Sequence, residues 1–274
     1  MNEVERRGTE LVKQALNKRA SDIHFHPKEK MIVIQFRING ALYEYGTMQK
    51  PFYERLLSHF KFQAKMDIGE KRRPQSGALN LSLHGQNVSV RLSTLPTPYL
   101  ESLALRLLPQ DQQMRLDELF LFPTAGNRLA TLLKHTAGLM LLTGTTGSGK
   151  TTTIYALLHE AVKQNNRRVI TVEDPIEKLN DAFTQMEVNE KAGITFAEGF
   201  KASLRHDPDL LMIGEIRDAK TAKIAIQAAL SGHFVISSMH AKNPIGALYR
   251  LREFGIPFID IQQTVIAVAT QMLV

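Results

Sequence analysis

Residues 139–162 read LMLLTGTTGSGKTTTIYALLHEAV. An apolar run of strand length leads into residues 144–151, which fit the pattern G-x-x-x-x-G-K-[ST], and a helical pattern follows. In this setting the glycines let backbone N–H groups curl around phosphates, and the start of the helix adds positive potential. An accidental Gly-rich turn is the alternative, but such a match arises by chance in only about 1% of chains this long. The stretch therefore predicts a strand, loop and helix that bind a nucleotide.

The residue types in this loop also predict what each one binds. Lys150 is long enough to reach the β- and γ-phosphate oxygens, and the Thr151 hydroxyl is a ligand for Mg²⁺. ATP and Mg²⁺ are therefore the expected cofactors. The predicted nucleotide-binding residues are Gly144, Thr145, Thr146, Gly147, Ser148, Gly149, Lys150, Thr151 and Thr152.

The second half of the chain alternates short apolar runs with helical stretches. Apolar runs of this length fill a parallel sheet that is buried on both faces, so we expect an α/β domain over residues 126–274. The predicted strands are residues 139–143, 168–173, 210–214 and 234–239.

The first part of the chain has a different pattern. We expect residues 1–105 to form a small α+β domain with an antiparallel sheet, and residues 106–125, which have little periodicity, to form a linker. The expected elements are helices over residues 4–20 and 51–64, and hairpins over residues 31–48, with the turn Asn39-Gly40, and 79–92, with the turn at 84–87.

Composition excludes several classes of protein. The 274 residues are 43% hydrophobic and 22% charged, which is typical of a globular chain. Because there is no Cys, disulfides, a thiolate nucleophile and Cys-ligated metals are excluded within these residues. No run approaches the roughly 20 apolar residues that cross a bilayer, and the N-terminus is unlike a signal peptide, so a cytoplasmic location is expected.

The net charge of +7 is distributed unevenly. Residues 1–105 carry an excess of +6 and residues 106–274 an excess of +1. The densest basic cluster, Lys71-Arg72-Arg73, has no interleaved aromatic residues that would stack on bases. We interpret it as a solvated or subunit-contacting turn and expect no direct nucleic-acid partner, with a nucleic-acid motor kept as an alternative.

Three polar residues end predicted strands. Glu173 and Glu215 end two of them, and the carboxyl ends of parallel strands converge on the ligand crevice of a doubly wound sheet. Both are expected to face the phosphate loop and to orient the attacking water or the water shell of the metal. His240 ends a third strand at the same edge. A γ-phosphate sensor and a satisfied polar residue are equal alternatives for it.

Phosphoryl transfer leaves charge on the γ-phosphate oxygens, which an arginine from the same or a neighbouring subunit neutralises. An exposed arginine in an ion pair is the alternative interpretation for each candidate, and position alone does not choose among them. The candidates are Arg91, Arg106, Arg205 and Arg217.

Four motifs in order resemble a known family. The runs GLMLLTGTTGSGKTTT, ITVEDPIE, LRHDPDLLMIGEIRD and GHFVISSMHAKN resemble the Walker A motif, Asp box, Walker B motif and His box of the secretion ATPases of type II secretion and type IV pili. The runs ASDIHFHP, FRINGAL, MDIGEKRRPQSGAL and VRLSTLPT are similar to the N-terminal domain of that family. The segment QMEVNEKAGITFAEGFKASLRHDPD resembles assembly rather than retraction ATPases, and the short N-terminal part resembles the assembly ATPase of competence pseudopili.

The resemblance implies a fold, a reaction and residue roles. It implies an N-terminal PAS-like domain and a RecA-like P-loop core in a hexamer that hydrolyses ATP. Hydrolysis would power assembly of a type IV pilus-like, competence or type II secretion apparatus through an inner-membrane platform protein, at the inner face of the membrane. Glu173 is implied as the base, Glu215 as the metal partner, His240 as a catalytic residue, and Arg91 and Arg205 as arginine fingers. The alternatives are a retraction ATPase, a RecA-like nucleic-acid motor and a non-hydrolysing scaffold.

The last residues, TVIAVATQMLV, are expected to be part of an apolar helix, and no capping residue ends it. Members of the family continue with further helices. The RecA-like domain is therefore expected to be truncated at its C-terminus.

Overall fold

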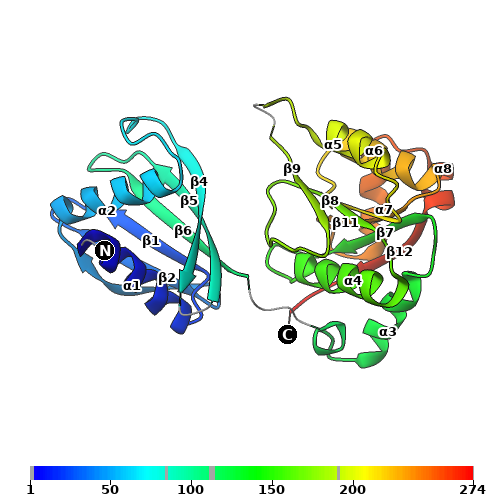
Figure 1. The fold of residues 1–274 in the computed structure, drawn as a ribbon, viewed down its shortest axis with the longest axis horizontal. Helices are drawn as coiled ribbons and strands as arrows, with labels where there is room; N and C mark the ends of the chain where they lie inside the picture. The colour runs from blue at the N-terminus through cyan, green and yellow to red at the C-terminus, as the bar shows by residue number, and fades with distance from the viewer. Residues whose placement is uncertain (1–2, 84–85, 111–114, 190–191, 274) are drawn as a thin grey trace. The chain divides into compact units, whose positions relative to one another are not determined.

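The computed structural model describes residues 3–83, 86–110, 115–189 and 192–273 (Figure 1). The chain forms two compact units, Met1–Gln112 and Gln113–Val274. The first unit extends beyond residue 105, because that residue lies inside strand β6 (Ser102–Pro109). Within the expected linker, residues 111–114 lie outside the described residues, and a 3-10 helix, η1 (Leu116–Glu118), already packs against the core of the second unit.

A six-stranded antiparallel sheet forms the first unit, in the order β3-β2-β1-β6-β5-β4. Its other strands are β1 (Asp22–Pro27), β2 (Ile32–Ile38), β3 (Ala41–Met48), β4 (Gln75–Leu83) and β5 (Gln86–Leu95). Both predicted hairpins, β2–β3 and β4–β5, are present, although residues 84–85 of the second turn lie outside the described residues. The sequence pattern did not predict β1 and β6, which pair with each other and join the two hairpins into one sheet.

Two helices, α1 (Glu3–Asn17) and α2 (Lys50–Gln63), cover one face of this sheet (Figure 1), and both were predicted. Their buried side chains join those of the sheet in a single core. The helices approach closely at Gly8, where a Cβ atom would lie 3.1 Å from Leu56 Cδ1 and 3.2 Å from Phe60 Cζ. A glycine at this position therefore lets α1 lie directly on α2.

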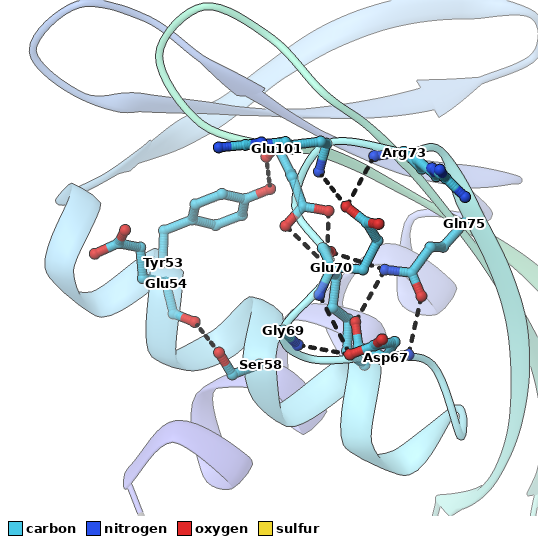
Figure 2. A network of polar contacts seen from close by, with 11 residues as sticks. Tyr53, Glu54, Ser58, Asp67, Gly69, Glu70, Arg73, Gln75 and Glu101 are labelled. Atoms are coloured by element: carbon cyan, nitrogen blue, oxygen red, sulfur yellow. Dashed lines mark hydrogen bonds and ion pairs between the residues drawn. The ribbon is translucent and has the colours of Figure 1, made fainter.

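A buried ion pair ties two loops of the first unit to α2, and Figure 2 shows Tyr53 of this helix directed at Glu101. Lys61 Nζ lies 2.7 Å from Glu101 Oε1 and also donates to the backbone oxygen of Glu70 at 2.8 Å. The two charged side chains are only 1% and 4% exposed, so each replaces lost hydration for the other. The Tyr53 hydroxyl donates to the backbone oxygen of Glu101 at 2.7 Å. Helix α2 thereby fixes the loops around Glu70 and Glu101.

The loop after α2 carries the basic cluster identified in the sequence. Glu70 Oε1 accepts hydrogen bonds from the backbone N–H groups of Arg72 at 2.7 Å and Arg73 at 3.2 Å. At the base of the loop, Gln75 Oε1 accepts from the backbone N–H of Asp67 at 2.9 Å. The basic residues of this turn are exposed. Their backbone is therefore held in place while their charged groups remain in contact with solvent.

The second unit is a three-layer α/β domain whose sheet has the order β12-β7-β11-β10-β8-β9, with all neighbours parallel. The strands are β7 (Gly138–Thr143), β8 (Val169–Glu173), β9 (Thr184–Glu187), β10 (Leu210–Glu215), β11 (Phe234–Met239) and β12 (Val265–Thr270). The helices are α3 (Pro123–Leu132), α4 (Lys150–Asn165), α5 (Phe196–Leu204), α6 (Ala219–Leu230), α7 (Pro244–Glu253) and α8 (Phe258–Thr264).

Alternate side chains of the sheet enter two separate cores. Leu139 and Leu141 of β7 pack on the side of α5 to α8, whereas Met140 and Leu142 pack on the side of α3 and α4. Figure 1 shows α4 on one side of the sheet and α5 and α6 on the other. The four strands predicted from apolar runs are confirmed as β7, β8, β10 and β11, whereas the short strand β9 had no apolar run to predict it.

The predicted helix at the end of the chain is wrong. Val265–Thr270 form β12, which pairs in parallel with β7. Most residues of this strand are β-branched, and such side chains pack well on a pleated sheet but lose rotamer freedom in a helix. The strand also places Gln271 beside the end of β7, where the backbone N–H of Gln271 donates to the backbone oxygen of Thr143 at 2.8 Å.

Candidate active site

The phosphate loop connects β7 to α4, as the sequence predicted. Gly144, Gly147 and Gly149 have φ values of 147°, 79° and 84°, which L side chains rarely adopt. Helix α4 begins at Lys150, and its first backbone N–H groups have no partner within the helix itself. The loop therefore ends at a helix N-terminus, the arrangement that binds phosphate groups.

The side chain of Lys150 folds back into the loop. Its Nζ donates to the backbone oxygens of Gly144 at 2.9 Å and Thr145 at 2.8 Å. Burial lowers the pKa of Lys150, and the charges of Glu215 and Glu177 act in the opposite direction. A buried ammonium held by two neutral carbonyls is well placed to exchange them for anionic phosphate oxygens.

A second polar group in the loop also fits a phosphate. Ser148 Oγ is buried, and within the part of the chain that the structure describes it has no hydrogen-bond partner. A buried hydroxyl without a partner costs free energy, and a phosphate oxygen would satisfy it. The donors of the loop therefore suit a polyanion.

Glu215 and His240 lie together at the carboxyl edge of the sheet, as predicted. His240 Nε2 is 2.9 Å from Glu215 Oε1, which is ion-pair distance when the imidazole is protonated, although no hydrogen bond is formed. The other carboxylate oxygen, Oε2, accepts a hydrogen bond from Arg217 Nε at 2.7 Å. Because Glu215 also acts on the charge of Lys150, this carboxylate is electrostatically part of the phosphate-loop site.

Glu173 is placed differently, in a buried network behind the end of β8. It is 2% exposed and accepts hydrogen bonds from Thr171 Oγ1 at 2.6 Å, from the Tyr155 hydroxyl at 2.8 Å and from Gln185 Nε2 at 3.3 Å. Burial raises the pKa of Glu173, and these hydrogen bonds partly oppose the rise. The proton affinity of this carboxylate is therefore higher than that of an exposed glutamate, and so closer to that of a general base.

Tyr155 and Gln185 were not predicted as site residues. Tyr155 lies on the buried face of α4, and its hydroxyl bonds both Glu173 and the backbone oxygen of Lys178. A tyrosine among buried apolar residues of an amphipathic helix was the available signal, since its hydroxyl needs a partner. Gln185 lies on β9, a strand that the sequence pattern did not predict.

The four candidate arginines occupy different surroundings. Arg217 bonds Glu215, and Arg106 pairs with Asp22 at 2.9 Å in the first unit. Arg91 is half-buried on β5 of the first unit, and Arg205 is exposed at the end of α5. Arg217 is thus the candidate that contacts a predicted catalytic carboxylate within its own unit.

Among the described residues there is no group of three or more His, Cys, Asp and Glu side chains able to hold a metal ion. Mg²⁺ usually keeps several waters and binds through one or two protein oxygens and substrate phosphates. In the same part of the chain, no helix combines the length and apolar character needed to span a membrane.

Comparison with known proteins gives consistent matches along the whole chain. Residues 1–274 match the family model described as Type II/IV secretion system protein. The chain is 50% identical to "Competence protein ComGA" of Bacillus subtilis over 274 residues, which are 100% of this chain and 77% of the relative. It is 44% identical to "Type II secretion system protein E" of Aeromonas hydrophila over 266 residues, which are 96% of this chain and 53% of the relative.

Solved structures share the fold. The Legionella pneumophila ATPase DotB has a TM-score of 0.80 at 23% identity, over 96% of this chain and 75% of that one. The pilus retraction motor PilT, solved with bound ADP, has a TM-score of 0.73 at 25% identity, over 97% of this chain and 78% of that one. The expected combination of an antiparallel N-terminal domain and a parallel RecA-like core is therefore confirmed.

Proposed function

The chain belongs to the Type II/IV secretion system protein family, and on that premise we propose that it is the motor that assembles a competence pseudopilus. It is an ATP hydrolase of the secretion ATPase type. The observation that best supports motor activity is the phosphate loop with the buried ammonium of Lys150. The negative charge of Glu215 interacts with this ammonium and raises its pKa. The greater identity to a competence protein than to type II secretion relatives supports the choice of system.

A pilus retraction motor is the second candidate. The likeness to PilT favours it, because the two folds agree over nearly the whole chain. Identity to PilT is half of that to ComGA, which supports assembly over retraction.

We assign the residue roles as follows. Lys150 and the backbone N–H groups of the loop would bind the β- and γ-phosphates. The hydroxyl of Thr151 and the carboxylate of Glu215 would hold Mg²⁺, which would neutralise phosphate charge. Glu173 acts as the base, a role that its raised pKa supports. We assign His240, whose Nε2 lies 2.9 Å from Glu215 Oε1, as the residue that would sense the γ-phosphate.

Assembly of several copies of the chain would supply further positive charge to the nucleotide. We assign Arg91 and Arg205 as arginine fingers that reach a nucleotide across domain or subunit boundaries in a hexamer. The ring would act on a platform protein of the inner membrane from its cytoplasmic face. The exposed turn at residues 71–73 offers a basic surface for such protein contacts.

The Lys150→Ala variant of the full chain tests this proposal. ATP turnover should be lost, since no other group in the loop carries a positive charge to the phosphates, while the circular dichroism spectrum should remain that of the wild type. Lys163→Ala changes an exposed lysine on the same helix and is the matched control. Turnover of Lys150→Ala near the wild-type rate would exclude the assigned site.

A further inference from the structure

The end of β12 lies directly against the phosphate loop. Thr270 Oγ1 and Thr143 Oγ1 are 2.7 Å apart, and the next residue, Gln271, donates its backbone N–H to the Thr143 oxygen at 2.8 Å. The ladder between β12 and β7 therefore continues to the residue at which the loop begins. This position gives Gln271 access to both ends of the loop.

The side chain of Gln271 bonds the first turn of α4. Its Oε1 accepts a hydrogen bond from Thr153 Oγ1 at 2.9 Å, and Thr153 is only 1% exposed. A buried hydroxyl that loses its partner carries a desolvation cost, so this bond constrains both residues. The start of the phosphate-binding helix is thereby linked to the edge strand of the sheet.

Gln271 also occupies the space that side chains would need at two loop glycines. A Cβ atom at Gly144 would lie 2.4 Å from the backbone oxygen of Gln271, and a Cβ atom at Gly149 would lie 2.9 Å from its Nε2. The first and last glycines of the motif are therefore required by this close approach as well as by their φ values. The loop is held between β7, α4 and Gln271.

The contact with Gln271 differs from the one that Lys150 makes. In the structure Lys150 bonds the carbonyls of Gly144 and Thr145, and these bonds must break when its ammonium turns to phosphate oxygens. The bond between Gln271 and Thr153 does not involve the ammonium, so that exchange does not require it to break. A loop that keeps its shape when phosphate arrives loses less conformational entropy on binding.

We propose that Gln271 is a positioning residue that holds the phosphate loop in its nucleotide-binding shape through Thr153 and through contact with Gly144 and Gly149. The inference rests on the proposed ATPase function and adds the edge strand β12 to the machinery of that site. Gln271 acts on the nucleotide through the loop, so its loss should weaken binding more than it slows the chemical step.

The test measures ADP binding by titration calorimetry and ATP turnover for the full chain and its variants. Gln271→Ala and Thr153→Val should each raise the Kd for ADP and the KM for ATP about 10-fold, the factor expected for one partly buried hydrogen bond, with kcat changed less than about 3-fold. Thr153→Ser keeps the hydroxyl and should bind ADP as the wild type does. The double variant should bind no more weakly than Gln271→Ala alone, because that substitution already removes the bond to Thr153.

Three results would overturn the inference: unchanged ADP affinity in Gln271→Ala, independent losses that add in the double variant, or a fall in kcat with KM unchanged. Thermal unfolding of each variant shows whether a loss of affinity reflects loss of fold. If the wild-type chain itself neither binds ADP nor hydrolyses ATP, the proposed function fails as well. If it does both and Gln271→Ala matches it, only the role of Gln271 fails.

Discussion

Glu215 Oε1 and His240 Nε2 lie 2.9 Å apart although they come from segments 25 positions apart in the chain. The parallel register of β10 and β11 brings them together, since Glu215 is opposite Ser238. The register shifts between Ile213 and Glu215, and such irregularities re-aim side chains at the ends of strands. With Arg217 on its other oxygen, the carboxylate of Glu215 is held between two groups that can carry positive charge.

The first prediction concerns this carboxylate. Glu215→Gln keeps the volume of the side chain and removes its charge, so ATP turnover should fall by about 10²-fold or more if the carboxylate holds the metal. Weaker dependence of the remaining rate on Mg²⁺ concentration should accompany the fall. Glu253→Gln, at an exposed position on α7, is the control. Wild-type turnover in Glu215→Gln would mean that another carboxylate acts.

The second prediction uses Tyr155 to test Glu173. The hydrogen bond from Tyr155 lowers the pKa of Glu173 against the rise caused by burial, so Tyr155→Phe should raise that pKa further. A base acts in its ionised form, and the acid limb of kcat should therefore move to higher pH. The ring remains in its edge contact with Phe183, whose centroid is 5.9 Å away. The experiment measures kcat from pH 5 to pH 9, a range of about two pH units on either side of neutrality.

Tyr249→Phe removes a hydroxyl from an exposed ring and serves as the control for this experiment. A loss of activity that is equal at every pH, with an unmoved acid limb, would show that Tyr155 supports structure and that Glu173 does not titrate in turnover.

Burial determined which strands were predictable. Strand β7 is buried along its whole length, so an uninterrupted apolar run is its direct signature. Strands β1 and β6 lie in the middle of the first sheet but carry Asp22 and Arg106 among their apolar residues. Those two charges pair with each other at 2.9 Å. The two residues are 84 positions apart in the chain. A local sequence pattern therefore cannot predict that each charge has a partner.

The parts of the site that lie at the ends of strands were predictable from the sequence. The convergence of parallel strands predicted the neighbourhood of Glu215 and His240, and the glycine pattern predicted the loop. The partners of Glu173 were not predictable, because Tyr155 and Gln185 reach it from elements whose relative packing is tertiary. Gln271 was not predicted as a site residue, because the apolar segment before it was interpreted as a helix. The β-branched residues of Val265–Thr270 favour the strand that is observed.

The third prediction concerns the buried pair of the first unit. Lys61→Met leaves the carboxylate of Glu101 buried without its cation, which should cost about 3–5 kcal/mol of folding free energy. Adding Glu101→Leu removes the stranded charge and should recover most of that loss. Hydrogen exchange of peptides from α2 reports the opening free energy of this unit separately from the second. Wild-type protection of these peptides in Lys61→Met would show that the ion pair does not control the stability of α2.

The last prediction concerns the arginines. Arg91 is half-buried on β5 and Arg205 is exposed at the end of α5, and both are proposed as arginine fingers. Arg205→Ala and Arg91→Ala should bind ADP nearly as the wild type does yet hydrolyse ATP about 10³-fold more slowly, the usual effect of removing an arginine finger. For the wild type, turnover per chain should rise with protein concentration as rings form.

Mixing variants distinguishes action within a subunit from action between subunits. A Lys150→Ala chain retains its arginines, and an Arg205→Ala chain retains its phosphate loop, so a mixed interface can pair one intact loop with one intact arginine. Mixing two inactive chains should therefore restore part of the turnover, and Arg91→Ala should behave alike if Arg91 also acts across an interface. The double variant Lys150→Ala/Arg205→Ala mixed with Arg205→Ala is the control, because no interface then carries the arginine. Turnover that is independent of concentration, with no recovery despite mixed rings seen by native mass spectrometry, would place the catalytic arginine in the same chain as the nucleotide it serves.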